Sequence, residues 1–152
     1  MPNRAEVPRT VLFPARVLAL LSFALLTGCG GAPGGPDAPP LSSEERLALP
    51  ADAASGARLS RICRTCHEVQ KGTGHRVGPN LWGVTGARPA RHKDFAYSQA
   101  LTRADFVWDE AALDAYLANP QRVVPGGRMA YAGMPDPADR RDVIAYLATL
   151  QD

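Results

Sequence analysis

The feature that most constrains this chain of 152 residues is the run Cys63-Arg64-Thr65-Cys66-His67. Two cysteines separated by two residues and followed at once by a histidine are the attachment signature of a c-type haem. The thiols add across the vinyl groups at one edge of the porphyrin, and the histidine then directs its imidazole at the iron from one face. The run therefore predicts one covalently bound haem c, attached through Cys63 and Cys66 with His67 as an axial ligand of the iron.

Two other interpretations of this run are a redox-active Cys-x-x-Cys pair and half of a zinc site. A zinc site needs about two more nitrogen or sulfur ligands at suitable spacing, and the chain has only one further cysteine. A thioredoxin-like site accompanies a βαβ pattern, and the sequence contains no such pattern. Both comparisons favour the haem.

The first 28 residues have the pattern of a bacterial export signal. Arg4, Arg9 and Arg16 form a positive region, and residues 17–26 form an apolar run that is too short to span a bilayer comfortably. The run ends in Leu26-Thr27-Gly28-Cys29, which resembles a lipobox, a signal in which the chain is cut before the cysteine and the thiol carries a diacylglyceryl group. We expect a lipoprotein signal peptide at residues 1–28, lipidation at Cys29 and no disulfide. The alternatives are an ordinary secretory signal with an incidental cysteine and an uncleaved anchor helix.

The composition then divides the rest of the chain into a tether and one domain. Residues 29–51 are rich in glycine, proline and alanine, and they have no hydrophobic period. A flexible segment of this length reaches roughly 25 Å, and a diacylated cysteine anchors stably. We therefore expect a domain at residues 52–152 that is exported to the periplasmic, extracytoplasmic face and held to the membrane by lipid. The net charge of +2 includes no basic block for nucleic acid.

Helical periods and caps occur within the domain, but no credible strand pattern does. We expect helices over about residues 53–66, from Asp109 as a cap to Asn119-Pro120, and over Pro137 to Leu150. A further helix start is indicated at Ser43-Glu44-Glu45-Arg46. The predicted fold is all-α, with three to four helices and long loops around one haem. The haem as the true core accounts for so many loops in one domain.

The second axial position has four candidate ligands, Met129, Met134, His75 and His92. His75 follows the haem run too closely to reach the opposite face easily, and His92 lies in a polar run. Met129 lies in a loop that can fold back over the porphyrin. Met134 is close to the last helix, where a methionine commonly fills a gap in the core.

Seven segments of residues 53–150 carry a resemblance to a known family. They are Cys63–His67, Gly78–Leu81, Phe95–Ser98, Trp108, Tyr116–Pro120, Val124–Met129 and Asp142–Leu147. In this order and close to this spacing, they resemble a class I cytochrome c of the mitochondrial and bacterial periplasmic type. The resemblance implies the class I cytochrome c fold, with His67 as the fifth ligand and Met129 as the sixth.

The resemblance also implies roles for residues around the haem. The carbonyl of Pro79 would accept the second N–H of His67, which fixes the imidazole and raises its basicity. Tyr97 and Trp108 would hydrogen-bond a buried propionate, and Tyr116 would lie beside the sulfur of Met129. For each aromatic residue the alternative is simple packing in the core.

Three positions depart from the family. Ala87 follows Gly86 where the family usually has an arginine, so Arg88 would have to reach the propionate from the next position. Gly127 replaces a threonine and Leu101 replaces an asparagine. The last two changes remove polar groups near the haem and could shift its potential.

The predicted function is one-electron transfer by a His/Met-ligated haem c, without enzyme activity. The family suggests a cytochrome bc complex as donor and a terminal oxidase as acceptor, and a photosynthetic centre or a nitrogen-oxide reductase is also compatible. Basic residues are expected to ring the exposed haem edge and to steer docking on acidic redox partners. They are Arg61, Arg64, Lys71, Arg76, Arg122 and Arg128.

Two alternatives to a mobile carrier stay open at this point. One is a haem enzyme or gas-sensing module whose sixth position is open or labile. The other is a fixed haem subunit of a single oxidoreductase complex, which would use the tether to stay in place. Rapid binding of carbon monoxide to the reduced protein would distinguish an enzyme or sensor from a carrier. Cross-linking in membranes to one fixed partner, and not to several, would distinguish a fixed subunit from a mobile carrier.

Overall fold

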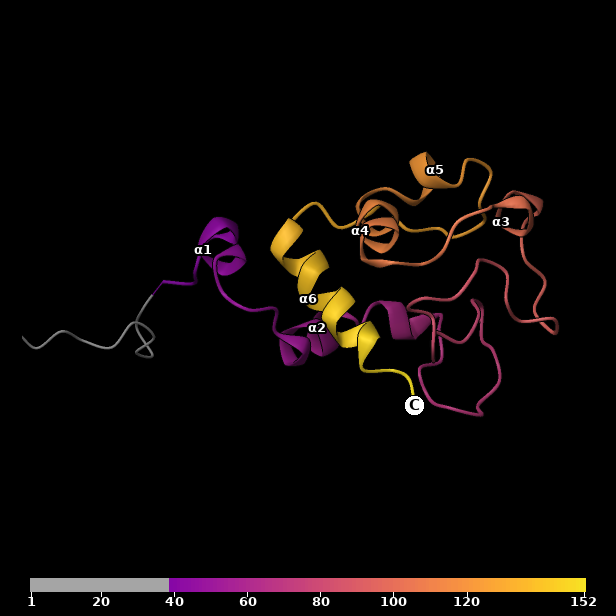
Figure 1. The fold of residues 1–152 in the computed structure, drawn as a ribbon, viewed down its shortest axis with the longest axis horizontal. Helices are drawn as coiled ribbons and strands as arrows, with labels where there is room; N and C mark the ends of the chain where they lie inside the picture. Colours follow the sequence, from indigo (N-terminus) through magenta and orange to yellow (C-terminus); the bar gives the residue numbers. More distant parts are fainter. Residues whose placement is uncertain (1–38) are drawn as a thin grey trace, which may run out of the picture. The chain divides into compact units, whose positions relative to one another are not determined.

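The computed structural model describes residues 39–152, and these residues form an all-α domain, as expected (Figure 1). Within this part of the chain there are six α-helices, one 3-10 helix and no strand. The number of helices is larger than the expected three to four, because several of them are short. The elements are α1 (Ser43–Leu47), α2 (Ala53–Leu59), η1 (Cys63–Thr65), α3 (Gln99–Arg103), α4 (Glu110–Ala118), α5 (Pro120–Val123) and α6 (Pro137–Ala148).

The expected signal peptide at residues 1–28, the lipidation site Cys29 and the first part of the tether lie outside the described residues. Among residues 39–152, no helix combines the length and the apolar character that a membrane crossing requires.

The domain is organised around the crossing of α2 and α6, which lie against each other in Figure 1. Gly56 lies at the crossing point and is fully enclosed. A Cβ atom there would overlap the backbone carbonyl of Asp142 and would lie 2.9 Å from the Cβ of Tyr146. The two helix backbones can therefore approach this closely only because residue 56 has no side chain.

The apolar core lies between α4 and α6. Leu113 and Leu117 of α4 pack with Val143, Ile144 and Leu147 of α6, all at most 9% exposed. The side chain of Asp109 accepts the N–H of Ala112 at 2.8 Å, so the expected start of α4 is confirmed. Met134 is buried in this core, in agreement with the suggestion that it fills a gap between core side chains.

The helix expected over residues 53–66 is divided in the structure, so the prediction was wrong in its second half. The α-helix ends at Leu59. The residues after it include hydrogen bonds that span three residues, as in a 3-10 helix: Arg61 N–H to Arg58 O at 3.3 Å and Thr65 N–H to Ile62 O at 3.3 Å. The hydroxyl of Thr65 also donates to the Ile62 carbonyl at 2.7 Å. A side chain that bonds the carbonyl of the preceding turn competes with regular helix.

The second half of the expected tether is structured as well, since α1 occupies Ser43–Leu47. A capping box begins it: Ser42 N–H donates to Glu45 Oε2 at 2.8 Å, and Glu45 N–H donates to Ser42 Oγ at 3.3 Å. Arg46 then pairs with Asp139 at 2.5 Å and with Asp142 at 2.8 Å on α6. A helix this short is marginal on its own, so its contacts with α6 hold it. α1 and its ion pairs with α6 therefore lie within the segment 29–51 that the sequence assigned to the tether.

Asp142 is the buried centre of this contact, with its side chain 3% exposed. Its carboxylate accepts the N–H of Asp52 at 3.0 Å and pairs with Arg46 at 2.8 Å and with Arg141 at 3.1 Å. Burial alone would raise the pKa of Asp142, but the hydrogen bond from Asp52 and the two guanidinium groups bring this pKa below its ordinary value. The residue therefore joins the segment before α2 to α6 as a carboxylate.

The lowered pKa of Asp142 predicts how stability depends on pH. Because the unfolded chain takes up this proton first, the contribution is complete above about pH 4 and is lost as pH falls through the lower folded-state pKa. We expect Asp142→Asn to cost about 2 kcal/mol of unfolding free energy at pH 7 and to flatten the loss of stability below pH 4. Denaturant unfolding from pH 2.5 to pH 7 measures both effects. Glu44→Gln, at an exposed carboxylate of α1, should keep the wild-type profile; an equally steep profile in Asp142→Asn would contradict the assignment.

Candidate functional site

His67 is held from two sides by the segment that follows it in the chain. Its Nδ1 lies 2.6 Å from the carbonyl oxygen of Pro79. A Cβ atom on Gly78 would lie 2.7 Å from Nδ1 and 2.8 Å from Nε2 of the ring, which is closer than real Cβ atoms approach. The backbone of Gly78 therefore lies flat against the imidazole, while the next residue fixes the rotation of the ring.

The hydrogen bond to Pro79 also defines the chemical form of His67. A carbonyl oxygen can only accept, so Nδ1 carries the proton and the lone pair is on Nε2. Burial lowers the pKa of His67, and the bond to Pro79 opposes that shift. The ring is therefore neutral near pH 7 and presents Nε2 as a ligand atom.

Asn80 holds this loop in place, a role that the sequence reasoning missed. Its side chain is buried, and its amide nitrogen donates to the carbonyls of Gln70 at 2.8 Å and Thr73 at 2.9 Å. Its Oδ1 accepts the N–H of Trp82 at 2.8 Å. The asparagine in the run Gly78-Pro79-Asn80-Leu81 could have indicated this role, because asparagine side chains commonly hydrogen-bond the backbone of a turn.

Cys63 is the first residue of η1, and Cys66 is its C-cap, directly before His67. They are not joined in a disulfide, and Cys63 is half-buried while Cys66 is exposed. Burial raises the pKa of the Cys63 thiol. The His67 N–H donates to the Cys63 carbonyl at 2.9 Å, so both thiols and the imidazole belong to one tight turn.

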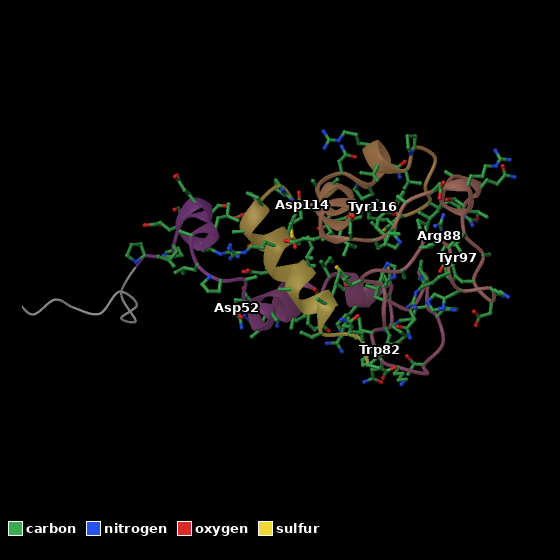
Figure 2. The ribbon with its side chains drawn as sticks, in the orientation of Figure 1. Asp52, Trp82, Arg88, Tyr97, Asp114 and Tyr116 are labelled. Carbon is green, nitrogen blue, oxygen red and sulfur yellow. The ribbon has the colours of Figure 1, made fainter. Side chains whose placement is uncertain are left out.

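Met129 lies on the loop between α5 and α6, beside Tyr116 of α4. The Tyr116 hydroxyl is 4.0 Å from the Met129 sulfur, the neighbourhood that the sequence resemblance implied. Tyr116, labelled in Figure 2, comes from α4. Its ring packs edge-to-face on that of Trp108, with ring centroids 4.8 Å apart. Trp108 is buried, and burial raises the pKa of the Tyr116 phenol.

The predicted propionate residues divide into two environments. Tyr97 is half-buried and packs edge-to-face on Phe95, with centroids 4.8 Å apart. Arg88 pairs with Asp105, and the two side chains are 68% and 85% exposed. Figure 2 shows Arg88 and Tyr97 on the loop-rich side of the domain, away from α2 and α6.

Arg91 is a second arginine of this loop, and the sequence reasoning did not consider it for the propionate. Its guanidinium donates to the carbonyl of Trp82. Partial burial lowers the pKa of Arg91, and the nearby Tyr97 phenol opposes that shift. Arg91 therefore lies close to Tyr97, as a propionate partner would, whereas Arg88 is paired at the surface.

These residues fit a covalently attached haem with two axial ligands. Two thiols and an imidazole lie on one turn, and the imidazole is fixed with Nε2 available. A thioether from a distant loop lies beside a buried phenol. In addition, the hydroxyl of Thr85 is buried without a hydrogen-bond partner among the described residues, so this part of the loop can accept a polar group of a ligand. Together the fold and the site define an all-α haem-binding domain of the Cys-x-x-Cys-His type.

Comparison with known proteins agrees with this class. The chain is similar to cytochrome c2 of Rhodopila globiformis, with 42% identity over 105 residues that cover 68% of this chain and 98% of the relative. It is also similar to cytochrome c2 of Rhodomicrobium vannielii, with 42% identity over 98 residues that cover 64% and 78%. A solved structure, cytochrome cH from Methylobacterium extorquens, has a TM-score of 0.62 and 39% identity and covers 65% of this chain and 99% of its own. No family model matches the chain.

The chain belongs to the class I cytochrome c family, as its sequence segments indicated. It is therefore an electron-transfer protein with covalently bound haem c, and it is not an enzyme.

The contact between Gly78 and His67 gives a direct test of how the imidazole is held. In Gly78→Ala the new methyl group displaces the ring, so we expect a loss of roughly 1–3 kcal/mol of unfolding free energy and a shifted midpoint potential. Thermal unfolding and a redox titration of the haem-loaded protein measure the two effects. Val77→Ala is the matched control, because Val77 is 82% exposed and adjacent to Gly78. An unchanged potential in Gly78→Ala would show that His67 is not positioned by this contact.

Proposed function

We propose that this protein is a membrane-tethered one-electron carrier whose haem is attached at Cys63 and Cys66 and ligated by His67 and Met129. The observation that carries the proposal is the fixed His67 imidazole, 2.6 Å from the Pro79 carbonyl, on the same turn as both cysteines. The place of Met129 beside the Tyr116 hydroxyl supports the second ligand. Met134 is less suited, because it is 9% exposed within the core and its N–H donates to the Leu117 carbonyl.

The bound haem supplies reversible one-electron exchange at its iron. The residues around it set the conditions for that exchange. Pro79 accepts the Nδ1–H of His67 and thereby makes Nε2 a stronger donor. A thioether at the second position favours the ferrous state and raises the potential. Tyr116, whose hydroxyl lies 4.0 Å from the Met129 sulfur, packs against the apolar core that contains Trp108 and Leu117, and this core excludes water on that side.

At the propionate side we propose Tyr97, Trp108 and Arg91. Arg91 replaces Arg88 in this role, because the Arg91 guanidinium donates to the Trp82 carbonyl near Tyr97, while Arg88 is paired with Asp105 in solvent. The chain thus compensates for Ala87, the position where the family usually has its arginine.

For the partners we propose acidic faces of a cytochrome bc complex and a terminal oxidase. Three of the predicted basic residues, Arg61, Arg64 and Arg76, line one hollow of about 310 Å³ together with His67 and Glu68, and Arg76 lies 3.6 Å from the Glu68 carboxylate. Cys66 is exposed next to this hollow, and Ile62 is 57% exposed. A positive rim around an apolar, exposed edge suits brief docking with steering by charge. Lys71 pairs with Asp152 instead and is outside this group.

We further propose that the protein is exported and held at the periplasmic face of a membrane through lipid on Cys29. The support is the sequence alone: the positive region, the apolar run at residues 17–26 and the Leu-Thr-Gly-Cys ending.

Substitution of Met129 tests the ligation. In Met129→Ala we expect the midpoint potential to fall by a considerable part of the roughly 0.8 V over which axial ligands set haem potentials, and we expect the reduced variant to bind carbon monoxide rapidly. Redox titration and the visible spectrum measure both effects. Met134→Ala is the matched control: it should lose about 2–5 kcal/mol of stability and keep the potential. Wild-type potential in Met129→Ala, or rapid carbon monoxide binding by the wild type, would contradict the proposal and favour an open or labile position.

Substitution of Cys29 tests the anchor separately. We expect Cys29→Ser to move the haem protein from the membrane fraction to the soluble periplasmic fraction, because the lipid attachment is lost. Fractionation followed by haem staining, with mass spectrometry of the wild-type N-terminus, measures this. A wild-type N-terminus without a diacylglyceryl group on Cys29 would count against lipidation, and one that still begins at Met1 would favour an uncleaved anchor.

A further inference from the structure

Three side chains that the haem site does not use come together in the loops before α3. They are His75, His92 and Asp94, and one nitrogen or oxygen atom from each lies within 4.8 Å of the other two. The two imidazole rings are half-buried and meet edge-to-face with centroids 4.6 Å apart, while Asp94 is exposed. The chain has three histidines, and both that are not in the haem run are in this cluster.

The cluster lies in a hollow that is open to solvent. The hollow has a volume of about 360 Å³, and besides the three cluster residues its wall includes Asn80, Trp82 and the positively charged Arg91. The side chain of His75 is 14% exposed and that of Asp94 is 80% exposed. A small ligand can therefore reach the two imidazoles past the carboxylate.

His92 is oriented as a metal ligand would be. Its Nε2 lies 3.1 Å from the carbonyl of Asn80, so this nitrogen carries the proton and Nδ1 has an available lone pair. Metal-bound histidines commonly donate their other N–H to a backbone carbonyl in this way. Burial, followed by the neighbouring Arg91 guanidinium, lowers the pKa of His92, so the ring is neutral near pH 7. The hydrogen bond from His75 lowers the pKa of Asp94, which is therefore ionised.

We propose that His75, His92 and Asp94 form a binding site for a divalent transition-metal ion of the zinc and copper class. Two imidazoles and one carboxylate are a donor set that such ions bind, and a water molecule completes the tetrahedral coordination of zinc. Ligand atoms around zinc are roughly 3.3 Å apart, as follows from zinc–ligand bonds of about 2.0–2.1 Å. The donors, which are at most 4.8 Å apart, therefore have to close by up to about 1.5 Å, and the exposed Asp94 side chain has the freedom to move.

His75 is the ligand that has to change most. At present its Nδ1 accepts the N–H of Asn80 at 3.0 Å, and its Nε2 lies 3.2 Å from Asp94 Oδ1. A cation at Nε2 takes the place of the proton shared with Asp94, and that proton moves to Nδ1. The Asn80 N–H then loses its acceptor, so His75 contributes less to affinity than His92 does. The positive charges of Arg91 and Lys93, on either side of His92 in the sequence, also weaken the site.

A zinc titration of the haem-loaded full chain tests the proposal. By isothermal calorimetry we expect saturable binding of one zinc ion per chain, weakened at least about 10-fold in His92→Ala and in Asp94→Asn. Asp105→Asn is the matched control, because Asp105 is an exposed carboxylate paired with Arg88 outside the cluster. Zinc should also raise the unfolding temperature of the wild type and of Asp105→Asn, but not that of His92→Ala.

Three outcomes would overturn the proposal. The first two are an absence of saturable zinc binding and wild-type zinc affinity in His92→Ala. The third is loss of zinc binding in Cys29→Ser, which would show that the Cys29 thiol binds the ion. If His92→Ala does not fold, His92→Gln takes its place. The glutamine amide can still donate to the Asn80 carbonyl but is a poor zinc ligand. Because this site does not involve Cys63, Cys66, His67 or Met129, its failure would leave the proposed ligation of the haem untouched.

Discussion

The hydrogen bond between His67 Nδ1 and the Pro79 carbonyl is the interaction on which the rest of the site depends. It fixes the rotation and the protonation of the imidazole, and the glycine before Pro79 allows the backbone to reach the ring at all. The same peptide group points its N–H, from Asn80, at His75. One peptide unit therefore joins the proposed axial ligand to the proposed metal site on the surface. Hydrogen bonds in such a chain polarise one another.

The helices supply a rigid frame for this loop, although they contribute few residues to the site. The crossing of α2 and α6 at Gly56 sets the turn that carries Cys63 and Cys66. α4 carries Tyr116 toward the Met129 loop, and its other face joins α6 in the core. The long loops are ordered by local hydrogen bonds, above all those of Asn80. This division of roles explains how a domain with little regular structure can hold the two proposed axial ligands, His67 and Met129, at defined positions.

Much of this arrangement could be predicted from local patterns in the sequence. The Cys-x-x-Cys-His run, the Asp109 cap, the last helix and the pairing of Tyr116 with Met129 all follow from spacing or from the family resemblance. The docking of α1 could not be predicted, because Arg46 and Asp142 are 96 positions apart and no local pattern connects them. The end of the first helix at Leu59 could not be predicted either, because residues 60–65 contain no proline or glycine to mark it. Arg88 and Arg91 are equally polar in the sequence, and only their partners, Asp105 and the Trp82 carbonyl, distinguish them.

X-ray absorption at the iron K-edge of the reduced protein tests the central claim, a haem iron held between His67 and Met129, most directly. This account predicts a sulfur scatterer in the iron's coordination shell together with nitrogen scatterers from the porphyrin and His67. A shell made of nitrogen and oxygen alone would contradict it, whatever else the protein binds.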